Sequence, residues 1–146
     1  MSRTPETTRK IMSSIKSKNT KPEMALRRTL WARGMRYRVN VMSLPGKPDI
    51  VFTKAKIAVF CDGDFWHGHN WAVRGLDSLN VELERYSPYW KDKILRNVKR
   101  DKENNALLES AGWLVIRIWE SQIKSDIEKC ANIIFDNYAD RCRLPI

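Results

Sequence analysis

Long apolar runs and closely spaced cysteines are both missing from this chain of 146 residues. No stretch approaches the ~18–20 consecutive apolar residues of a membrane-spanning helix, and the opening Met-Ser-Arg-Thr-Pro-Glu lacks the apolar segment of a secretory signal. The three cysteines, Cys61, Cys130 and Cys142, form no Cys-x-x-Cys pair, which argues against a disulfide framework and a cysteine-rich zinc site. We therefore expect a protein of the reducing cytoplasm that does not associate with membranes.

Internal repeats and low-complexity tracts are also absent, whereas residues able to form a core are plentiful. Hydrophobic residues make up 42% of the chain, and six residues are tryptophan, which excludes a disordered chain. The length fits one domain. We expect a basic N-terminal arm over residues 1–19, where apolar anchors are few, and a single domain over residues 20–146.

Positive charge is concentrated near the N-terminus. Residues 1–38 contain 11 basic and two acidic residues, a net charge of +9, whereas the remainder contains 16 basic and 15 acidic residues. An asymmetric basic region attracts a polyanion through counterion release, and nucleic acid is the commonest such partner. The alternative is a solvated basic surface.

Local signals predict the order helix, three strands, helix, strand, helix. The expected elements are a helix that starts within Asn19–Glu23 and runs to about Arg33, a strand around Tyr37–Val41, a hairpin of Asp49–Phe52 and Lys56–Asp62, a helix from Ser87 to about Ala111, a strand over Trp113–Trp119 and a last helix that begins with a capping box at Ser125–Glu128. Residues 63–85 are less regular. This order indicates an α/β domain with a central sheet and helices packed on it.

Two aspartates mark the ends of the predicted hairpin strands. Asp49 begins one strand and Asp62 ends the next, directly before Gly63. If the two strands pair, both carboxylates can meet at one end of the sheet, where their oxygens would suit a hard cation such as Mg²⁺. Aspartates beside strands also act as turn formers, which is the alternative.

Both histidines of the protein lie in the next segment, residues 62–71, among aromatic residues. Beside a metal–phosphate site, His67 could accept a proton from an attacking water near neutral pH. Phe65 and Trp66 are adjacent, so one or both could present a stacking surface to bases. The alternatives are a zinc half-site built from His67 and His69, or a small aromatic core.

The long helix combines polar residues on its apolar side with many basic residues. Asn97 and Asp101 are four residues apart and share a face with Ile94 and Val98, so they either hydrogen-bond internally or point into a site. The basic residues suit phosphate contacts or a solvated face. Glu23 is one of two acids in the basic N-terminal region and suits either a site role or the helix dipole.

Five blocks in order carry a resemblance to a known family. They are residues 12–23, 43–49, 60–69, 93–101 and 112–120, with a collinear match over about residues 9–120. The sequence resembles the very short patch repair (Vsr) DNA mismatch endonucleases, a branch of the restriction-endonuclease-like PD-(D/E)xK superfamily. The resemblance implies a three-layer core with a central mixed sheet flanked by helices, and an endonuclease domain over residues 20–146.

The resemblance implies a role for each site residue. Asp49 matches the metal-binding aspartate, and Cys61 stands where the family offers a main-chain carbonyl to the metal. His67 matches the histidine that activates water, and Asp101 the carboxylate that orients it. The further expectations are Glu23 as the N-terminal acid of the site, Asp62 at a catalytic position that varies among members, and Asn97 as a supporting residue behind the site.

The resemblance also implies contacts with DNA. Phe65 and Trp66 match aromatic residues placed at the mismatch, and Met12 and Ile15 in the arm match residues that wedge in from the other groove. The further DNA-binding residues that we expect are Lys16, Lys18, Trp90, Arg96 and Arg100.

One departure from the family concerns zinc. Family members typically hold a structural zinc ion with three cysteines and a histidine, whereas the corresponding positions here are Asp64, His69, Trp71 and Ser121. We therefore expect no structural zinc, with Trp71 and its neighbours replacing the metal by packing.

The function implied is Mg²⁺-dependent nicking of one strand of double-stranded DNA at T:G mismatches, by a monomer located in the cytoplasm with the nucleoid. One alternative is a restriction-type or mobile-element endonuclease with another target. The other is a non-catalytic nucleic-acid-binding domain, against which the intact Asp49, His67 and Asp101 argue, because binding alone requires none of them.

Overall fold

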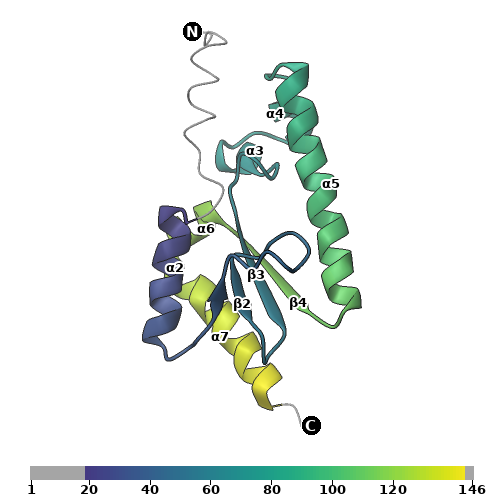
Figure 1. Ribbon diagram of the computed structural model, residues 1–146. Coiled ribbons are helices and arrows are strands. Elements are labelled where there is room, and N and C mark those ends of the chain that lie inside the picture. The colour runs from purple at the N-terminus through teal and green to yellow at the C-terminus, as the bar shows by residue number, and fades with distance from the viewer. Residues whose placement is uncertain (1–18, 144–146) are drawn as a thin grey trace.

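The computed structural model describes residues 19–143, which form a four-stranded sheet with helices on both faces (Figure 1). The elements are α2 (Lys21–Ala32), β1 (Arg38–Val39), β2 (Ile50–Phe52), β3 (Ile57–Asp62), α3 (Asn70–Val73), α4 (Leu79–Leu83), α5 (Pro88–Ser110), β4 (Leu114–Trp119), α6 (Glu120–Ser125) and α7 (Ile127–Arg143). The predicted α/β class with a restriction-endonuclease-like core is confirmed. The arm residues Met12, Ile15, Lys16 and Lys18 lie outside the described residues.

The sheet has the order β1-β2-β3-β4 and is mixed. β1 and β2 are antiparallel, as are β2 and β3, whose register pairs Phe52 with Ile57 and so confirms the predicted hairpin. β4 runs parallel to β3 and pairs Asp62 with Trp119. Because β3 and β4 are parallel, with α5 in the crossover between them, the carboxyl ends of both strands lie at the same end of the sheet.

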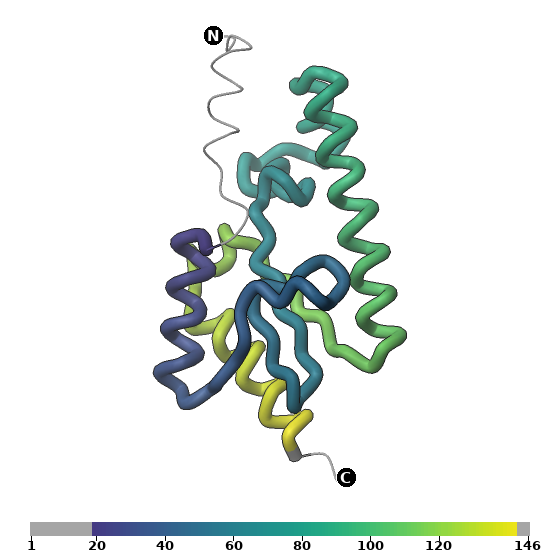
Figure 2. Tube along the Cα trace, viewed as in Figure 1, coloured from purple at the N-terminus to yellow at the C-terminus, as the bar shows by residue number. Residues whose placement is uncertain are grey.

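The two faces of the sheet are covered by different helices, which makes three layers (Figure 2). Alternate residues of β3 such as Ile57 and Val59 pack with α2 and α7 in the larger core. Ala58 and Phe60 point the other way and pack against Leu108 of α5. Since side chains alternate along a strand, Asp62 and Arg117 face α5 as well.

The starts and ends of the long helices follow local chemistry. Thr20 caps α2 by accepting a hydrogen bond from the Glu23 amide at 3.4 Å. α5 has proline in its first turn and ends before Gly112, whose φ of +88° favours a residue without a Cβ. The start of α2 and both ends of α5 agree with the prediction.

The predicted cap of the last helix is wrong by one residue. Asp126 accepts a hydrogen bond from the Lys129 amide at 3.1 Å, whereas the Ser125 hydroxyl donates to the Gln122 carbonyl at 3.2 Å and belongs to α6. The sequence did not predict α6, nor α3 and α4 within residues 63–85, because helices of four to six residues are too short to show an apolar period. Within residues 19–143 no helix has the length and apolar character needed to cross a bilayer.

Candidate active site

Asp49 lies next to β3, where the hairpin holds it. Its amide donates to the Val59 carbonyl at 3.0 Å, and its Oδ2 accepts a hydrogen bond from the Cys61 amide at 2.7 Å. Burial raises the pKa of Asp49 to about 7, together with the charges of Glu23 and Asp62, although the Cys61 amide opposes this shift. Asp49 is therefore a buried carboxyl beside two other acids, and a bound cation would favour its charged form.

Glu23 belongs to α2, which packs on the face of the sheet opposite to α5, and its side chain lies near Asp49. Its side chain is buried and pairs with Arg27, and its Oε1 accepts a hydrogen bond from the Asn19 amide at 3.2 Å. Glu23 also contributes to the raised pKa of Asp49. Its burial beside another acid goes beyond what a helix-dipole role requires.

His67 lies between two carboxylates. Its Nδ1 donates a hydrogen bond to Asp101 Oδ2 of α5, and its Nε2 lies 3.9 Å from Asp62 Oδ1 at the end of β3. The hydrogen bond to Asp101 leaves Nε2 as the proton acceptor of the neutral ring. Burial lowers the pKa of His67, but the Asp101 hydrogen bond and the charges of both acids outweigh it, so that the pKa is raised above 6.5.

Arg117 of β4 also belongs to this cluster, although the sequence analysis did not select it. Its Nη1 lies 3.0 Å from both carboxylate oxygens of Asp62 and 3.5 Å from Asp101 Oδ1. Burial raises the pKa of Asp62, against the opposing charges of His67 and Arg117. The available signal was a charged residue in the otherwise apolar run of residues 113–119.

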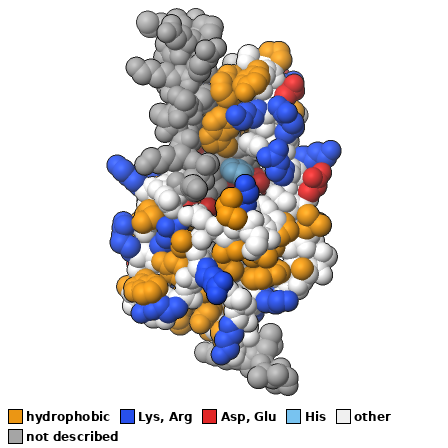
Figure 3. Space-filling view, viewed as in Figure 1, with side chains coloured by type: hydrophobic (Ala, Val, Ile, Leu, Met, Phe, Trp, Pro, Cys, Tyr) orange, Lys and Arg blue, Asp and Glu red, His pale blue; other side chains and the backbone are white. Residues whose placement is uncertain are grey.

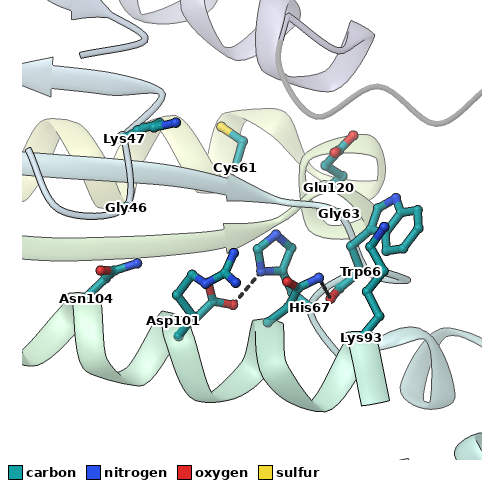
Figure 4. A pocket seen from close by; sticks show the side chains of 12 residues that line it. Gly46, Lys47, Cys61, Gly63, Trp66, His67, Lys93, Asp101, Asn104 and Glu120 are labelled. Carbon is teal, nitrogen blue, oxygen red and sulfur yellow. Dashed lines mark hydrogen bonds and ion pairs between the residues drawn. The ribbon is translucent and has the colours of Figure 1, made fainter. Parts of the chain in front are cut away.

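These side chains line two adjoining cavities of about 580 and 310 Å³. His67, Asp101 and Cys61 line both cavities, whereas Asp49, Asp62 and Arg117 line the smaller one. Figure 4 shows the larger one, with Asp101 projecting from α5 to His67 and with Glu120 across the cavity. Glu120, Lys47 and Asn104 also line the larger cavity and were not predicted. Lys47 and Glu120 lie within blocks 43–49 and 112–120, which was the available signal, whereas Asn104 lies outside all five blocks.

An aromatic and basic cluster borders the larger cavity. Phe65 packs edge-on against Trp66 at 5.0 Å between ring centroids, and Trp66 lies 5.9 Å from Trp90. Lys93 of α5 lies 4.9 Å above the Trp66 ring. The side-chain amide of Asn97 donates to the Trp66 carbonyl at 3.1 Å, so it holds the loop that carries Phe65 and Trp66, the aromatic loop, against α5.

The basic residues of α5 continue along the exposed side of that helix. Arg96 and Arg100 are both exposed, and Arg100 also lines the larger cavity. Figure 3 shows Lys and Arg side chains beside hydrophobic ones on this face, around a histidine. Such a surface can contact a phosphate backbone with its cations and bases with its rings.

Three of the four positions at which the resemblance implies zinc ligands in other family members, Asp64, His69 and Ser121, are joined by hydrogen bonds. Asp64 Oδ1 accepts from His69 Nδ1 and from the Ser121 hydroxyl, both at 2.7 Å, and Asp64 Oδ2 accepts from the Ser121 amide at 3.0 Å. The His69 ring stacks on Trp119 at 4.1 Å, whereas Trp71 lies edge-on at 6.3 Å. This cluster ties the aromatic loop to the start of α6.

Replacing Asp64 with alanine should destabilise the protein and weaken activity through the displaced loop. Loss of three hydrogen bonds at a mostly buried carboxylate should lower the free energy of unfolding by about 1–3 kcal/mol. Urea unfolding of this variant, beside the exposed control Asp77→Ala, measures the effect. Equal unfolding midpoints for the two variants would show that the cluster does not hold the loop.

Two groups of residues could hold a divalent cation. Asp62, His67 and Asp101 offer ligand atoms within 4.8 Å of one another, but Arg117 already supplies a positive charge to both carboxylates. Asp49 offers a hard carboxylate oxygen near Glu23, and no Lys, Arg or His side chain within residues 19–143 forms an ion pair with it. The chemistry of the donors and their charge therefore fit the cation better at Asp49.

Comparison with known proteins identifies relatives of this chain. Residues 2–73 match the family described as DNA mismatch endonuclease Vsr. The chain is 43% identical over 138 residues to the type II nicking enzyme V.NmeDIP of Neisseria meningitidis serogroup C, covering 94% of this chain and 90% of the relative. It is 41% identical over 140 residues to the type II nicking enzyme V.HpaIIP of Haemophilus parainfluenzae, covering 95% of this chain and 96% of the relative.

A third relative carries the family's own name. The chain is 32% identical over 115 residues to the DNA mismatch endonuclease Vsr of Escherichia coli strain K12, covering 79% of this chain and 70% of the relative. The protein is therefore an endonuclease that acts on DNA, with the divalent metal requirement that such a nuclease implies. The chain belongs to the Vsr family of DNA mismatch endonucleases.

Proposed function

We propose that this protein nicks one DNA strand 5′ to the thymine of a T:G mismatch, as left by deamination of 5-methylcytosine. The observation that carries the proposal is the His67–Asp101 pair, which lines the same cavity as the aromatic Trp66. A mispair stacks less strongly than a matched pair, so Phe65 and Trp66 can insert beside it at a smaller cost. The E. coli relative's name, a mismatch endonuclease, supports the same target.

In the proposed reaction, His67 Nε2 accepts the proton of the attacking water, and Asp101 fixes the imidazole with its Nδ1 proton in place. The Asp49 carboxylate and the Cys61 carbonyl would hold Mg²⁺, with Glu23 nearby. When bound, Mg²⁺ supplies Lewis-acid stabilisation of the charge that develops on the phosphate and the departing 3′-oxygen. Asn97 keeps the Trp66 loop against α5.

The DNA-binding surface consists of two parts in this proposal. The basic arm over residues 1–19 adds affinity by phosphate contact and places Met12 and Ile15 at the mismatch. Arg96, Arg100 and Trp90 extend the contact along α5. The single domain over residues 20–146 then acts as a monomer, because the two adjoining cavities of one chain together contain Asp49, Cys61, His67 and Asp101, which are assigned to one cut.

A second candidate function differs only in its target. The two relatives with the highest identities quoted above are named type II nicking enzymes, and a hydrogen-bonded Asp64 cluster lies at positions where the resemblance implies zinc ligands in other members of the family. Both observations favour a nicking enzyme associated with restriction that cuts at a different site.

The test is a pooled nicking assay with two sets of duplexes that share randomised flanking bases. One set has a central T:G mispair in a cytosine methylation context and the other a T:A pair. With Mg²⁺, we expect nicks 5′ to the mispaired thymine only, and none with EDTA. Equal nicking of the paired set would contradict mismatch specificity and favour the second function. If neither set of duplexes is nicked, the result contradicts both proposed functions.

A further inference from the structure

Arg117 lies between the two acids that flank His67. Its Nη1 contacts both oxygens of Asp62 at 3.0 Å and Asp101 Oδ1 at 3.5 Å. Asp101 in turn accepts from His67 Nδ1, and Asp62 lies 3.9 Å from His67 Nε2. One guanidinium therefore connects the carboxylates on the two sides of the imidazole.

The position of this guanidinium is fixed by further contacts. Its Nε donates to Asn105 Oδ1 of α5 at 2.7 Å, and its Cζ lies 3.9 Å above the Phe60 ring of the neighbouring strand. The side chain is only 17% exposed. A planar guanidinium held through Nε, Nη1 and its ring-facing side can fix carboxylates with little further loss of entropy.

The charge of Arg117 opposes that of the acids on His67. It lowers the pKa of His67 and of Asp62, whereas Asp62 and Asp101 raise that of His67. The other charged side chains that line the cavity with His67 are Asp49, Lys47, Lys93, Arg100 and Glu120. Of these residues and Arg117, only Arg117 is found in ion pairs with both flanking acids.

We propose that Arg117 is a positioning residue for strand cleavage, which holds Asp62 and Asp101 in place on the two sides of His67. This inference rests on the proposed role of His67. Arg117 lines the smaller cavity and does not lie on the exposed basic side of α5, so we expect it to contribute to the chemical step and not to DNA affinity.

The test compares Arg117→Met, which retains much of the packing on Phe60, with Arg117→Lys, which retains the charge. On the duplex that the wild type nicks fastest, single-turnover nicking by Arg117→Met at pH 7 should fall about 10- to 100-fold. The acidic limb of its pH–rate profile should move to higher pH, since His67 would stay protonated longer. Arg117→Lys should recover part of both effects.

A matched control is Arg33→Met, which removes an arginine paired with Glu128 between α2 and α7. It should leave the single-turnover rate and the acidic limb of the pH–rate profile unchanged. The inference is overturned if Arg117→Met keeps the wild-type rate and pH–rate profile. It is also overturned if the rate falls while the acidic limb of that profile stays in place, or if only the DNA affinity falls. His67→Gln separates the two proposals, because activity of that variant would refute the role of His67 itself.

Discussion

Replacing Asp49 with asparagine should lower the nicking rate by about 1,000-fold or more. Asparagine keeps the acceptor for the Cys61 amide, which Asp49 Oδ2 now binds at 2.7 Å, but it lacks the negative charge that a divalent cation requires. Charge stabilisation by a metal contributes several kcal/mol to the transition state, and about 1.4 kcal/mol corresponds to tenfold in rate. Loss of the metal from this site should therefore remove most of the catalysis.

The same substitution should leave the metal-free protein at least as stable as the wild type. The pKa of Asp49 is raised to about 7 by burial and by the charges of Glu23 and Asp62, so folding favours the protonated carboxyl. The stability that this provides is present at low pH and is lost as the pH rises toward 7. At pH 8 Asp49→Asn should thus be more stable by on the order of 1 kcal/mol in EDTA.

Two measurements on one protein preparation separate these effects. Nicking rates report the loss of catalysis, and thermal unfolding at pH 8 with and without Mg²⁺ reports the site itself. Mg²⁺ should raise the unfolding midpoint of the wild type but not that of Asp49→Asn. The control is Asp136→Asn, an exposed aspartate of α7, which should behave as the wild type. An equal response of Asp49→Asn to Mg²⁺ would place the metal elsewhere.

The long elements could be predicted from the sequence because each has its own local signal. Pro88 and Gly112 limit α5, and the apolar runs on either side of residues 53–55 form the hairpin. The end of α6 and the start of α7 could not be separated from the sequence, because Ser125 and Asp126 are both good capping residues by type. Only the fold decides that Ser125 closes α6 while Asp126 caps α7.

The residues of the candidate site could also be predicted only in part. The resemblance selected Asp49, His67 and Asp101, and the structure brings His67 and Asp101 into hydrogen-bond contact from positions 34 residues apart. Arg117 could not be paired with Asp62 from the sequence, because that contact depends on the parallel register of β3 and β4 and on the side of the sheet that α5 covers. A local pattern contains neither of these facts.

Replacing Asp101 with asparagine should lower nicking by about 100- to 10,000-fold and move its pH dependence. Asp101 accepts a hydrogen bond from His67 Nδ1, which fixes the ring so that Nε2 can accept a proton. An asparagine amide can reverse this arrangement by donating to Nδ1, which turns the proton acceptor away from the water. Removal of an oriented general base costs about 100- to 10,000-fold in rate.

The direction of the pH shift follows from the charges around His67. Burial lowers the pKa of His67, whereas the hydrogen bond and charge of Asp101, with the charge of Asp62, raise it above 6.5. The base works when neutral, so nicking should increase with pH through this pKa. Without the Asp101 charge the pKa falls, and the acidic limb should move to lower pH.

This shift is opposite to the one expected for Arg117→Met, so the two variants test one electrostatic arrangement from both sides. The matched control is Glu103→Gln, which removes an exposed acid from the same helix and should change the rate by less than about twofold. Single-turnover nicking from pH 5.5 to 9 measures all three variants. If the limbs of Asp101→Asn and Arg117→Met move in the same direction, charge at His67 does not control the limb, and another group must accept the proton.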